Sequence, residues 1–298
     1  MAVVAAWLVT VWAAGTLAPA FLETQSGQLL VLSAAAVLLA VVGAIDDIRP
    51  LPQWLRFAVQ CLAVGMILAA LPDDFQLVPQ VPRWIERICL LLGGVWMVNL
   101  TNFMDGIDWM IVAQFVPVTG AIVLLGSLDT IDPLSALVAA TLFGAILGFA
   151  PFNKPVARLF LGDVGSLPLG LLLGWLLLQL AGRGHVAAAI ILPLYYVADA
   201  TITLGRRVAR GEPVWQAHRS HFYQRAIDNR FTVMQVVTRV FLVNALLSSL
   251  ALVSTQARNL PVEIFLVAAS VAVVVWLLFE FARRGPEIER QGAPPIGS

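Results

Sequence analysis

Five aspartates stand beside long apolar runs in this chain, and charge next to hydrocarbon is costly unless it is used. Asp46 and Asp47 follow one apolar run, Asp105 and Asp108 interrupt another, and Asp163 precedes a third. Adjacent carboxylates can hold Mg²⁺, or one can raise the pKa of the other so that it acts as a base. The first pair therefore indicates a site for a cation or a proton, with a solvated helix end as the alternative.

A second group of polar residues recurs in steps of three: Asn99, Asn102, Asp105 and Asp108. In a helix this spacing keeps the side chains on one slowly drifting face. Amides and carboxylates on such a face could hold a metal, a sugar amide and a nucleotide together. We expect Gly106 to break or bend the helix, and an amide ladder between packed helices is the alternative function.

The third motif runs from Asn153 to Ser166 and combines Lys154 and Arg158 with a Gly-Asp-Val-Gly-Ser turn that opens an apolar run. Such a turn can direct backbone N–H groups at phosphate while Asp163 binds a metal. The alternative is an ordinary helix N-cap supplied by Asp163 or Ser166.

The fourth motif places His218 and His221 three residues apart, with Arg219 between them and Arg225 after them. Cationic neighbours repel Zn²⁺, so this arrangement suits phosphate or a diphosphate better than a metal. The alternative is a helix that lies in the lipid headgroup layer.

The elements that position these motifs are membrane helices. Hydrophobic residues make up 60% of the chain, charged residues 12%, and the mean hydropathy is +0.88. A soluble domain would carry roughly 25% charged residues. The pattern predicts an all-α, polytopic integral membrane protein with about ten transmembrane helices in a single domain, residues 1–298. The expected spans are Ala2–Leu22, Gln28–Ile45, Trp54–Leu71, Ile88–Leu100, Ile107–Leu128, Pro133–Ala150, Leu167–Ala181, Val186–Leu204, Val236–Thr255 and Pro261–Phe281. The fourth and seventh are short unless motif residues extend them.

If these spans alternate in direction, all four motifs fall on one side of the membrane. Fourteen cationic residues share that side, and only Arg83, Arg87, Arg183 and Arg258 lie opposite. Because Lys and Arg accumulate on the cytoplasmic side, the motifs are predicted to be cytoplasmic. The basic surface favours anionic ligands. Two cysteines, Cys61 and Cys89, indicate neither a disulfide nor a metal framework.

In this order and spacing, GAIDD, NLTNFMDGID, NKPVARLFLGDVGS and HRSHFYQR resemble the polyprenyl-phosphate N-acetylhexosamine-1-phosphate transferases of glycosyltransferase family 4. The resemblance runs from about Val41 to Arg225, and HRSHFYQR is most similar to the branch that initiates O-antigen or related glycans. It implies transfer of a sugar 1-phosphate from a UDP-amino sugar to undecaprenyl phosphate in the bacterial inner membrane, with release of UMP. It also implies Mg²⁺, with Mn²⁺ as the alternative, and no nucleic-acid partner, and it leaves open whether the protein forms a homodimer.

The resemblance assigns roles to individual residues. Asp163 becomes the principal metal ligand with Asp105, and Asp46 or Asp47 deprotonates or positions the lipid phosphate, which Arg56 contacts. The residues expected to hold nucleotide, sugar, metal or diphosphate are Asn99, Asn102, Asp105, Asp108, His218, Arg219 and His221. Asp199, inside a predicted span, is a further functional candidate, with pairing to Arg206 or Arg207 as the alternative.

Departures from the family pattern are visible as well. Family members usually begin with one more span and a basic cytoplasmic loop, so a start codon placed too late is the simplest expectation, and a catalytically impaired protein is the alternative. Trp109 stands where Gly is usual and Thr101 where a larger residue is common. A polytopic anion transporter is disfavoured because the acids lie at span ends rather than at mid-membrane. No residue identifies the sugar: GlcNAc, GalNAc, FucNAc and QuiNAc all remain candidates.

Overall fold

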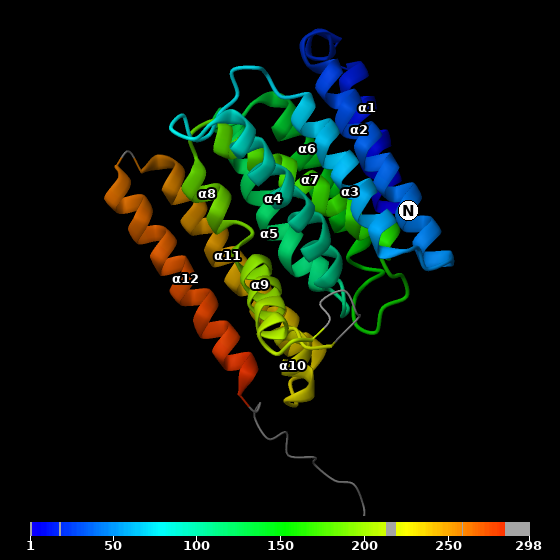
Figure 1. The fold of residues 1–298 in the computed structure, drawn as a ribbon, viewed down its shortest axis with the longest axis vertical. Coiled ribbons are helices and arrows are strands. Elements are labelled where there is room, and N and C mark those ends of the chain that lie inside the picture. The colour runs from blue at the N-terminus through cyan, green and yellow to red at the C-terminus, as the bar shows by residue number, and fades with distance from the viewer. Residues whose placement is uncertain (1, 18, 213–218, 258, 284–298) are drawn as a thin grey trace, which may run out of the picture.

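The computed structural model describes residues 2–17, 19–212, 219–257 and 259–283, and every regular element within these ranges is a helix (Figure 1). The long helices run side by side, and their ends form two opposite faces of the molecule. The helices are α1 (Ala2–Leu17), α2 (Pro19–Ile48), α3 (Gln53–Ala69), α4 (Arg83–Phe103), α5 (Met110–Ser127), α6 (Pro133–Phe149), α7 (Asp163–Gly182), α8 (Val186–Ile191), α9 (Leu194–Ala209), α10 (Phe222–Asp228), α11 (Val233–Gln256) and α12 (Leu260–Ala282).

Helix length and hydropathy confirm a polytopic membrane protein. Within the described ranges, six helices are long and apolar enough to cross a bilayer: α2, α4, α5, α7, α11 and α12. The predicted number of about ten spans is therefore not confirmed. Three shorter apolar helices accompany them: Ala2–Ala14, Gln53–Ala69 and Pro133–Phe149. Large side chains such as Phe265 and Phe279 of α12 are exposed, as expected for a surface that faces lipid. Motif residues lengthen α4 and α7 as expected.

The predicted span from Val186 to Leu204 is wrong as a single helix. It divides into α8 and α9 at Pro193, whose missing N–H and ring interrupt the helical hydrogen bonds. The side chain of Gln114 on α5 donates to the carbonyl of Leu192 at 3.2 Å and so satisfies a backbone group at the break. This break directs α9 toward the face that carries the motifs (Figure 1).

Helix α7 forms the centre of the site because it packs against both α2 and α4. Two glycines permit close approach. A Cβ at Gly170 would lie 2.7 Å from Cα of Val98 on α4, and a Cβ at Gly43 would lie 2.6 Å from the backbone nitrogen of Val164 on α7. The close packing brings the ends of α2, α4 and α7, and with them three of the four motifs, to one place.

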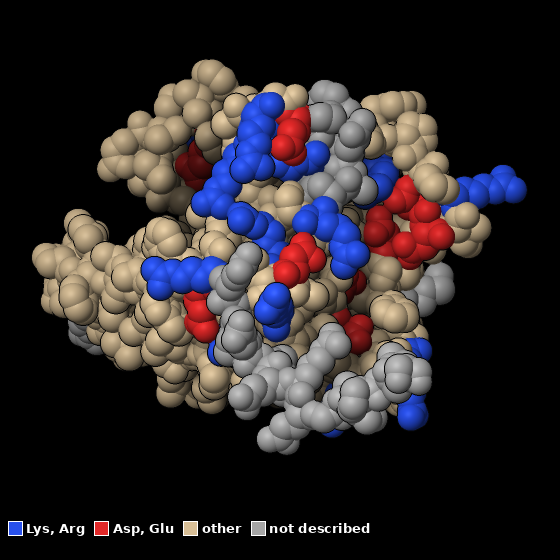
Figure 2. All heavy atoms as spheres, turned by 90° about the horizontal axis from the view of Figure 1, so that it is seen from below, with Lys and Arg blue, Asp and Glu red and all other residues tan. Residues whose placement is uncertain are grey.

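The face formed by these helix ends is strongly charged. Figure 2 shows Lys and Arg side chains spread over it, with acidic side chains among them and the largest acidic group at the right of the view. Ion pairs join the two signs at several points, for example Arg239 to Glu280 at 2.8 Å and Arg207 to Glu212 at 3.0 Å. Cationic side chains are therefore numerous at this end of the molecule, and the predicted sidedness in the membrane stays a prediction.

Candidate functional site

Arg56 joins two of the motif carboxylates. Its Nη1 lies 2.9 Å from Oδ2 of Asp46, and its Nη2 lies 3.3 Å from Oδ2 of Asp163. Asp46 also accepts the backbone N–H of Leu51 at 2.6 Å, which fixes the short loop between α2 and α3. A single guanidinium thus holds the ends of α2 and α7 together, while its own helix, α3, begins just after Pro52.

Asp47 closes the start of α7 from another helix. Its carboxylate accepts the N–H of Asp163 at 3.0 Å and that of Val164 at 3.2 Å. The N-cap position is Gly162, with φ at +66° and no side-chain cap, so capping by Asp163 or Ser166 is not found. A negative charge is favourable at a helix N-terminus. In this structure these two amides bind a carboxylate, and phosphate binding by the turn stays a prediction.

Asn102 connects α4 to the start of α7. Its side-chain nitrogen donates to Oδ1 of Asp163 at 2.6 Å and to the hydroxyl of Ser166 at 2.9 Å. Asn99, one turn earlier, pairs instead with Gln60 on α3, with N–O distances of 2.6 and 3.2 Å. Asn99 therefore forms the amide ladder considered as the alternative, and Gln60 is a buried member of it that the sequence analysis missed. A single polar residue within an apolar span was the available signal.

The helical face expected from Asn99 to Asp108 extends only halfway. Helix α4 ends at Phe103, and Asp105 and Asp108 lie in the connection to α5, so the break expected near Gly106 is confirmed and the continuous face is wrong. Asp108 accepts the N–H of Ala157 at 3.0 Å. Three-residue spacing alone could not show this, because the spacing places side chains on one face only while the chain stays helical.

These side chains surround a cavity of about 280 Å³ at the motif face. It is lined by Asn102, Asp105, Gly106, Ile107, Asp108, Asn153, Phe160, Leu161, Gly162 and Asp163. Burial raises the pKa of Asp105 well above its usual value, and the nearby charges of Asp163 and Asp47 raise it further. The cavity thus concentrates negative charge that a cation would neutralise.

His221 of the fourth motif is buried, with 3% of its surface exposed. Its Nδ1 lies 3.2 Å from Oδ1 of Asp199, and the same carboxylate accepts the N–H groups of Phe222 at 2.9 Å and Tyr223 at 3.2 Å. Asp199 is fully buried and fixes the start of α10 against α9. An exposed helix in the headgroup layer is therefore not what this half of the motif forms.

Tyr223 ties that motif to the cavity, because its hydroxyl donates to the carbonyl of Phe103 at 3.0 Å. Arg219 is exposed, at the end of a connection that precedes α10. His218 lies outside the described residues. The guanidinium of Arg206 lies over the ring of Phe222, 4.6 Å from its centre.

Comparison with known proteins agrees with these motifs. The sequence profile described as Glycosyl transferase family 4 matches residues 29–181, which is just over half of the chain. The chain belongs to glycosyl transferase family 4. The matched segment contains the Asp46–Asp47 pair, Asn102, Asp105 and Asp163, so it includes the whole lining of the polar cavity.

Relatives of this family 4 chain extend beyond the matched region. The phospho-N-acetylmuramoyl-pentapeptide-transferase of Mycobacterium ulcerans (strain Agy99) is 34% identical over 157 residues, which cover 44% of this chain and 43% of the relative. The probable undecaprenyl-phosphate N-acetylglucosaminyl 1-phosphate transferase of Bacillus subtilis (strain 168) is 26% identical over 243 residues, covering 77% and 67%. The chain thus matches less than half of the first relative's length and about two thirds of the second's.

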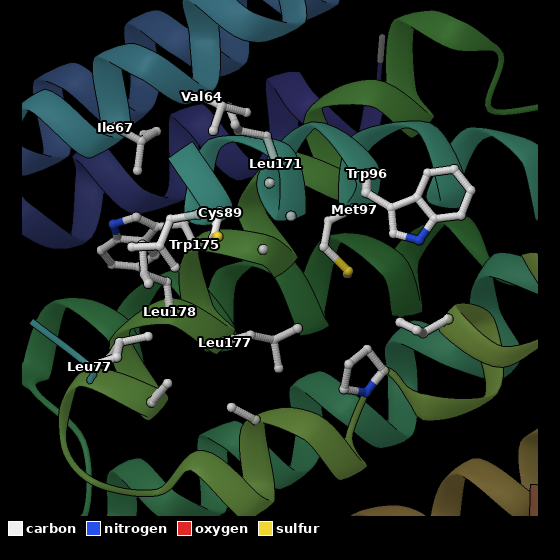
Figure 3. Close-up of a pocket in the computed structure, with 18 of the residues that line it drawn as sticks. Val64, Ile67, Leu77, Cys89, Trp96, Met97, Leu171, Trp175, Leu177 and Leu178 are labelled. Carbon is white, nitrogen blue, oxygen red and sulfur yellow. The ribbon is translucent and has the colours of Figure 1, made fainter. Parts of the chain in front are cut away.

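A second, apolar cavity of about 460 Å³ opens between α3, α4, α7, α8 and α9. Figure 3 shows Val64, Met97 and Leu171 around it, with Trp96 and Trp175 on the two sides of the view. Val64 lies one turn from Gln60, and Met97 lies two residues before Asn99. The amide pair between Gln60 and Asn99 therefore lies close to lining residues of this apolar cavity.

The donor set at the polar cavity suits a hard divalent cation. Asp105 and Asp163 line one cavity, and burial, followed by the charges of Asp163 and Asp47, raises the pKa of Asp105. Carboxylate oxygens are the ligands that Mg²⁺ prefers, together with water and substrate phosphates. Within the described part of the chain, no three His, Cys, Asp or Glu side chains are already gathered as a metal site. A site that takes most of its ligands from water and substrate fits both observations.

Proposed function

We propose that this family 4 protein transfers an N-acetylhexosamine 1-phosphate, or a related amino sugar 1-phosphate, from a UDP-sugar to undecaprenyl phosphate and releases UMP. The observation that carries the proposal is Arg56, which bridges Asp46 and Asp163 at the rim between helices, beside a polar cavity rich in carboxylates. The names of the relatives from Mycobacterium ulcerans and Bacillus subtilis support the same reaction class. The step would initiate O-antigen or another cell-envelope glycan.

The reaction brings two anions together. An oxygen of the lipid phosphate attacks the β-phosphorus of the UDP-sugar, the bond from that phosphorus to the oxygen of the α-phosphate breaks, and UMP leaves with the electron pair. Catalysis of this kind depends on positioning and on neutralising charge. Arg56 is the cation placed to receive the lipid phosphate, and its two carboxylate partners hold it in position.

Mg²⁺, with Mn²⁺ as the alternative, would be held by Asp163 and Asp105 and would supply charge neutralisation for the diphosphate. Asn102 fixes the Asp163 carboxylate through a 2.6 Å hydrogen bond, so that this oxygen is already oriented. Asp47 keeps the start of α7 in place through two backbone N–H groups. We therefore assign Asp47 a positioning role and leave the lipid phosphate to Asp46 and Arg56.

Two further features accommodate the remaining parts of the substrates. Phe160 lines the polar cavity and is 71% exposed, which leaves an aromatic face for the uracil ring. The apolar cavity between α3, α4, α7, α8 and α9 can take part of a polyprenyl chain, because apolar residues line it throughout (Figure 3). The cationic asymmetry supports a site on the cytoplasmic side of the bacterial inner membrane.

The decisive experiment measures UMP release by the purified protein with undecaprenyl phosphate, Mg²⁺ and a panel of UDP-amino sugars, and mass spectrometry then identifies the lipid product. Asp163→Asn should lower turnover at least about 10³-fold while thermal unfolding in detergent stays similar. Asp74→Asn, at an exposed position on the opposite face, is the matched control. Absence of UMP release with every donor, or an active Asp163→Asn variant, would refute the proposal.

A further inference from the structure

Trp109 has a backbone conformation that bulky residues rarely adopt. It is the N-cap of α5, with φ at +63° and ψ at 3°, in the left-handed region. The Cβ atom of an L-residue clashes with backbone in this region, so glycine is preferred there. A tryptophan at this position must be held by specific contacts, and those contacts indicate what it does.

Both polar groups of Trp109 bind the segment that follows α6. Its backbone N–H donates to Oδ1 of Asn153 at 2.8 Å, and its indole N–H donates to the carbonyl of Ala150 at 2.7 Å. Asn153 is buried, and its side-chain nitrogen donates to the carbonyl of Leu159 at 2.9 Å, so it links Trp109 to a second residue of the same loop. We define residues 151 to 162 as the 151–162 segment. Trp109 therefore fixes this segment at Asn153 and fixes the end of α6 directly before it at Ala150.

The 151–162 segment forms one wall of the polar cavity. It contributes Asn153, Phe160, Leu161 and Gly162, and the opposite wall comes from residues 102–108. Apolar packing holds this segment at Leu161, which is buried, whereas Val156 is 93% exposed and Phe160 is 71% exposed. Between Asn153 and Phe160 its position depends largely on hydrogen bonds, among them the bond from Trp109 to Asn153 and the bond from Ala157 to Asp108. The bond from Trp109 to Ala150 fixes the residue directly before the segment.

We infer that Trp109 is a positioning residue that locks the 151–162 segment against the 102–108 wall and thereby sets the affinity of the cavity for the nucleotide sugar. The identity of the substrate in this inference rests on the proposed function, whereas the contacts by which Trp109 fixes the segment do not depend on it. The indole N–H is essential to the lock, because phenylalanine would fill similar space and lack a donor. Glycine would fit the backbone angle and keep only the bond to Asn153.

The first test is limited trypsin digestion of the purified protein without substrate, with mass spectrometry of the fragment that ends at Arg158. Arg158 is exposed, and its cleavage rate reports how often the segment leaves its place. Trp109→Phe and Trp109→Gly should each speed this cleavage at least about threefold. Asp129→Gly is the matched control, because Asp129 also has a positive φ, at +53°, and lies in the α5–α6 connection on the opposite face. It should leave the Arg158 cleavage rate unchanged.

The second test is steady-state kinetics with the UDP-sugar that the parent protein accepts. Loss of one hydrogen bond in Trp109→Phe should raise KM about fivefold while kcat stays within about twofold. If the Trp109 variants are cleaved faster at Arg158 but the parent protein shows no turnover, the proposed function is contradicted and the positioning role of Trp109 still holds. An unchanged cleavage rate at Arg158 in Trp109→Phe, or an unchanged KM alongside faster cleavage, would overturn the inference. Trp109→Gly fits the backbone angle, so it keeps the test valid if the phenylalanine variant folds poorly.

Discussion

Gly43 offers the most direct test of the site geometry, because a single methyl group there reaches the start of α7. The Cβ of Gly43→Ala would lie 2.6 Å from the backbone nitrogen of Val164 and would also overlap the carbonyl of Asp163. Ordinary contact begins near 3.4 Å. The first turn of α7 would therefore have to move by about 0.8 Å, the difference between the two distances.

That displacement falls on the bonds that assemble the site. Asp163 and Val164 are the residues whose N–H groups bind Asp47, and Asp163 also bonds Asn102 and Arg56. Overpacking of this kind costs about 1–3 kcal/mol of stability. Misplacement of a reacting group by about 1 Å can lower turnover by about 10²-fold. We expect Gly43→Ala to lose about that much UMP release.

Gly65→Ala is the matched control, because Gly65 lies within α3 and a Cβ there meets no atom within 4 Å. Alanine is favoured over glycine in a helix by about 1 kcal/mol, so this variant should unfold at the same or a higher temperature with normal turnover. UMP release and thermal unfolding in one detergent provide both readouts. If Gly43→Ala keeps turnover within about twofold of the parent, close contact between α2 and α7 does not position the carboxylates that we propose to act in the reaction.

Asp105→Asn should lose turnover yet raise the unfolding temperature at pH 8. A carboxyl group whose pKa is raised in the folded state lowers stability when it is ionised, and that stability returns as the pH falls through the pKa. The variant should therefore gain less stability than the parent on acidification from pH 8 to pH 5. Equal unfolding profiles for variant and parent would contradict a raised pKa of Asp105 in the folded state. His221→Ala should lower the unfolding temperature as well as turnover, because the ring is buried. His218→Ala should lower kcat/KM for the UDP-sugar at least about tenfold without loss of expression. Full activity of both variants would leave the motif without a catalytic role. Val156→Cys, in a background without the two native cysteines, should resist an impermeant thiol reagent in intact cells and react after permeabilisation, and labelling in intact cells would reverse the predicted orientation.

The sequence by itself determined the all-helical membrane architecture and the gathering of three motifs on one face. Long apolar runs can satisfy their backbone groups in lipid only as helices or closed barrels, and their length here matches helices. The extensions of α4 and α7 followed because Asn102 and Asp163 continue the adjoining spans. The break near Gly106 was equally predictable from the conformational preference of glycine.

Only the tertiary structure decided which partner each polar group has. Asp47 binds the N–H of Asp163 at the N-terminus of α7, more than a hundred positions along the chain, and Gln60 of α3 pairs with Asn99 of α4. His221 is buried and contacts the carboxylate of Asp199 on α9, although a helix in the lipid headgroup layer was one of the two expectations for its motif. Motif spacing reports neighbours along one helix, whereas hydrogen-bond partners depend on how closely separate helices approach. That approach is set by small residues such as Gly43, whose role has no local signature in the sequence.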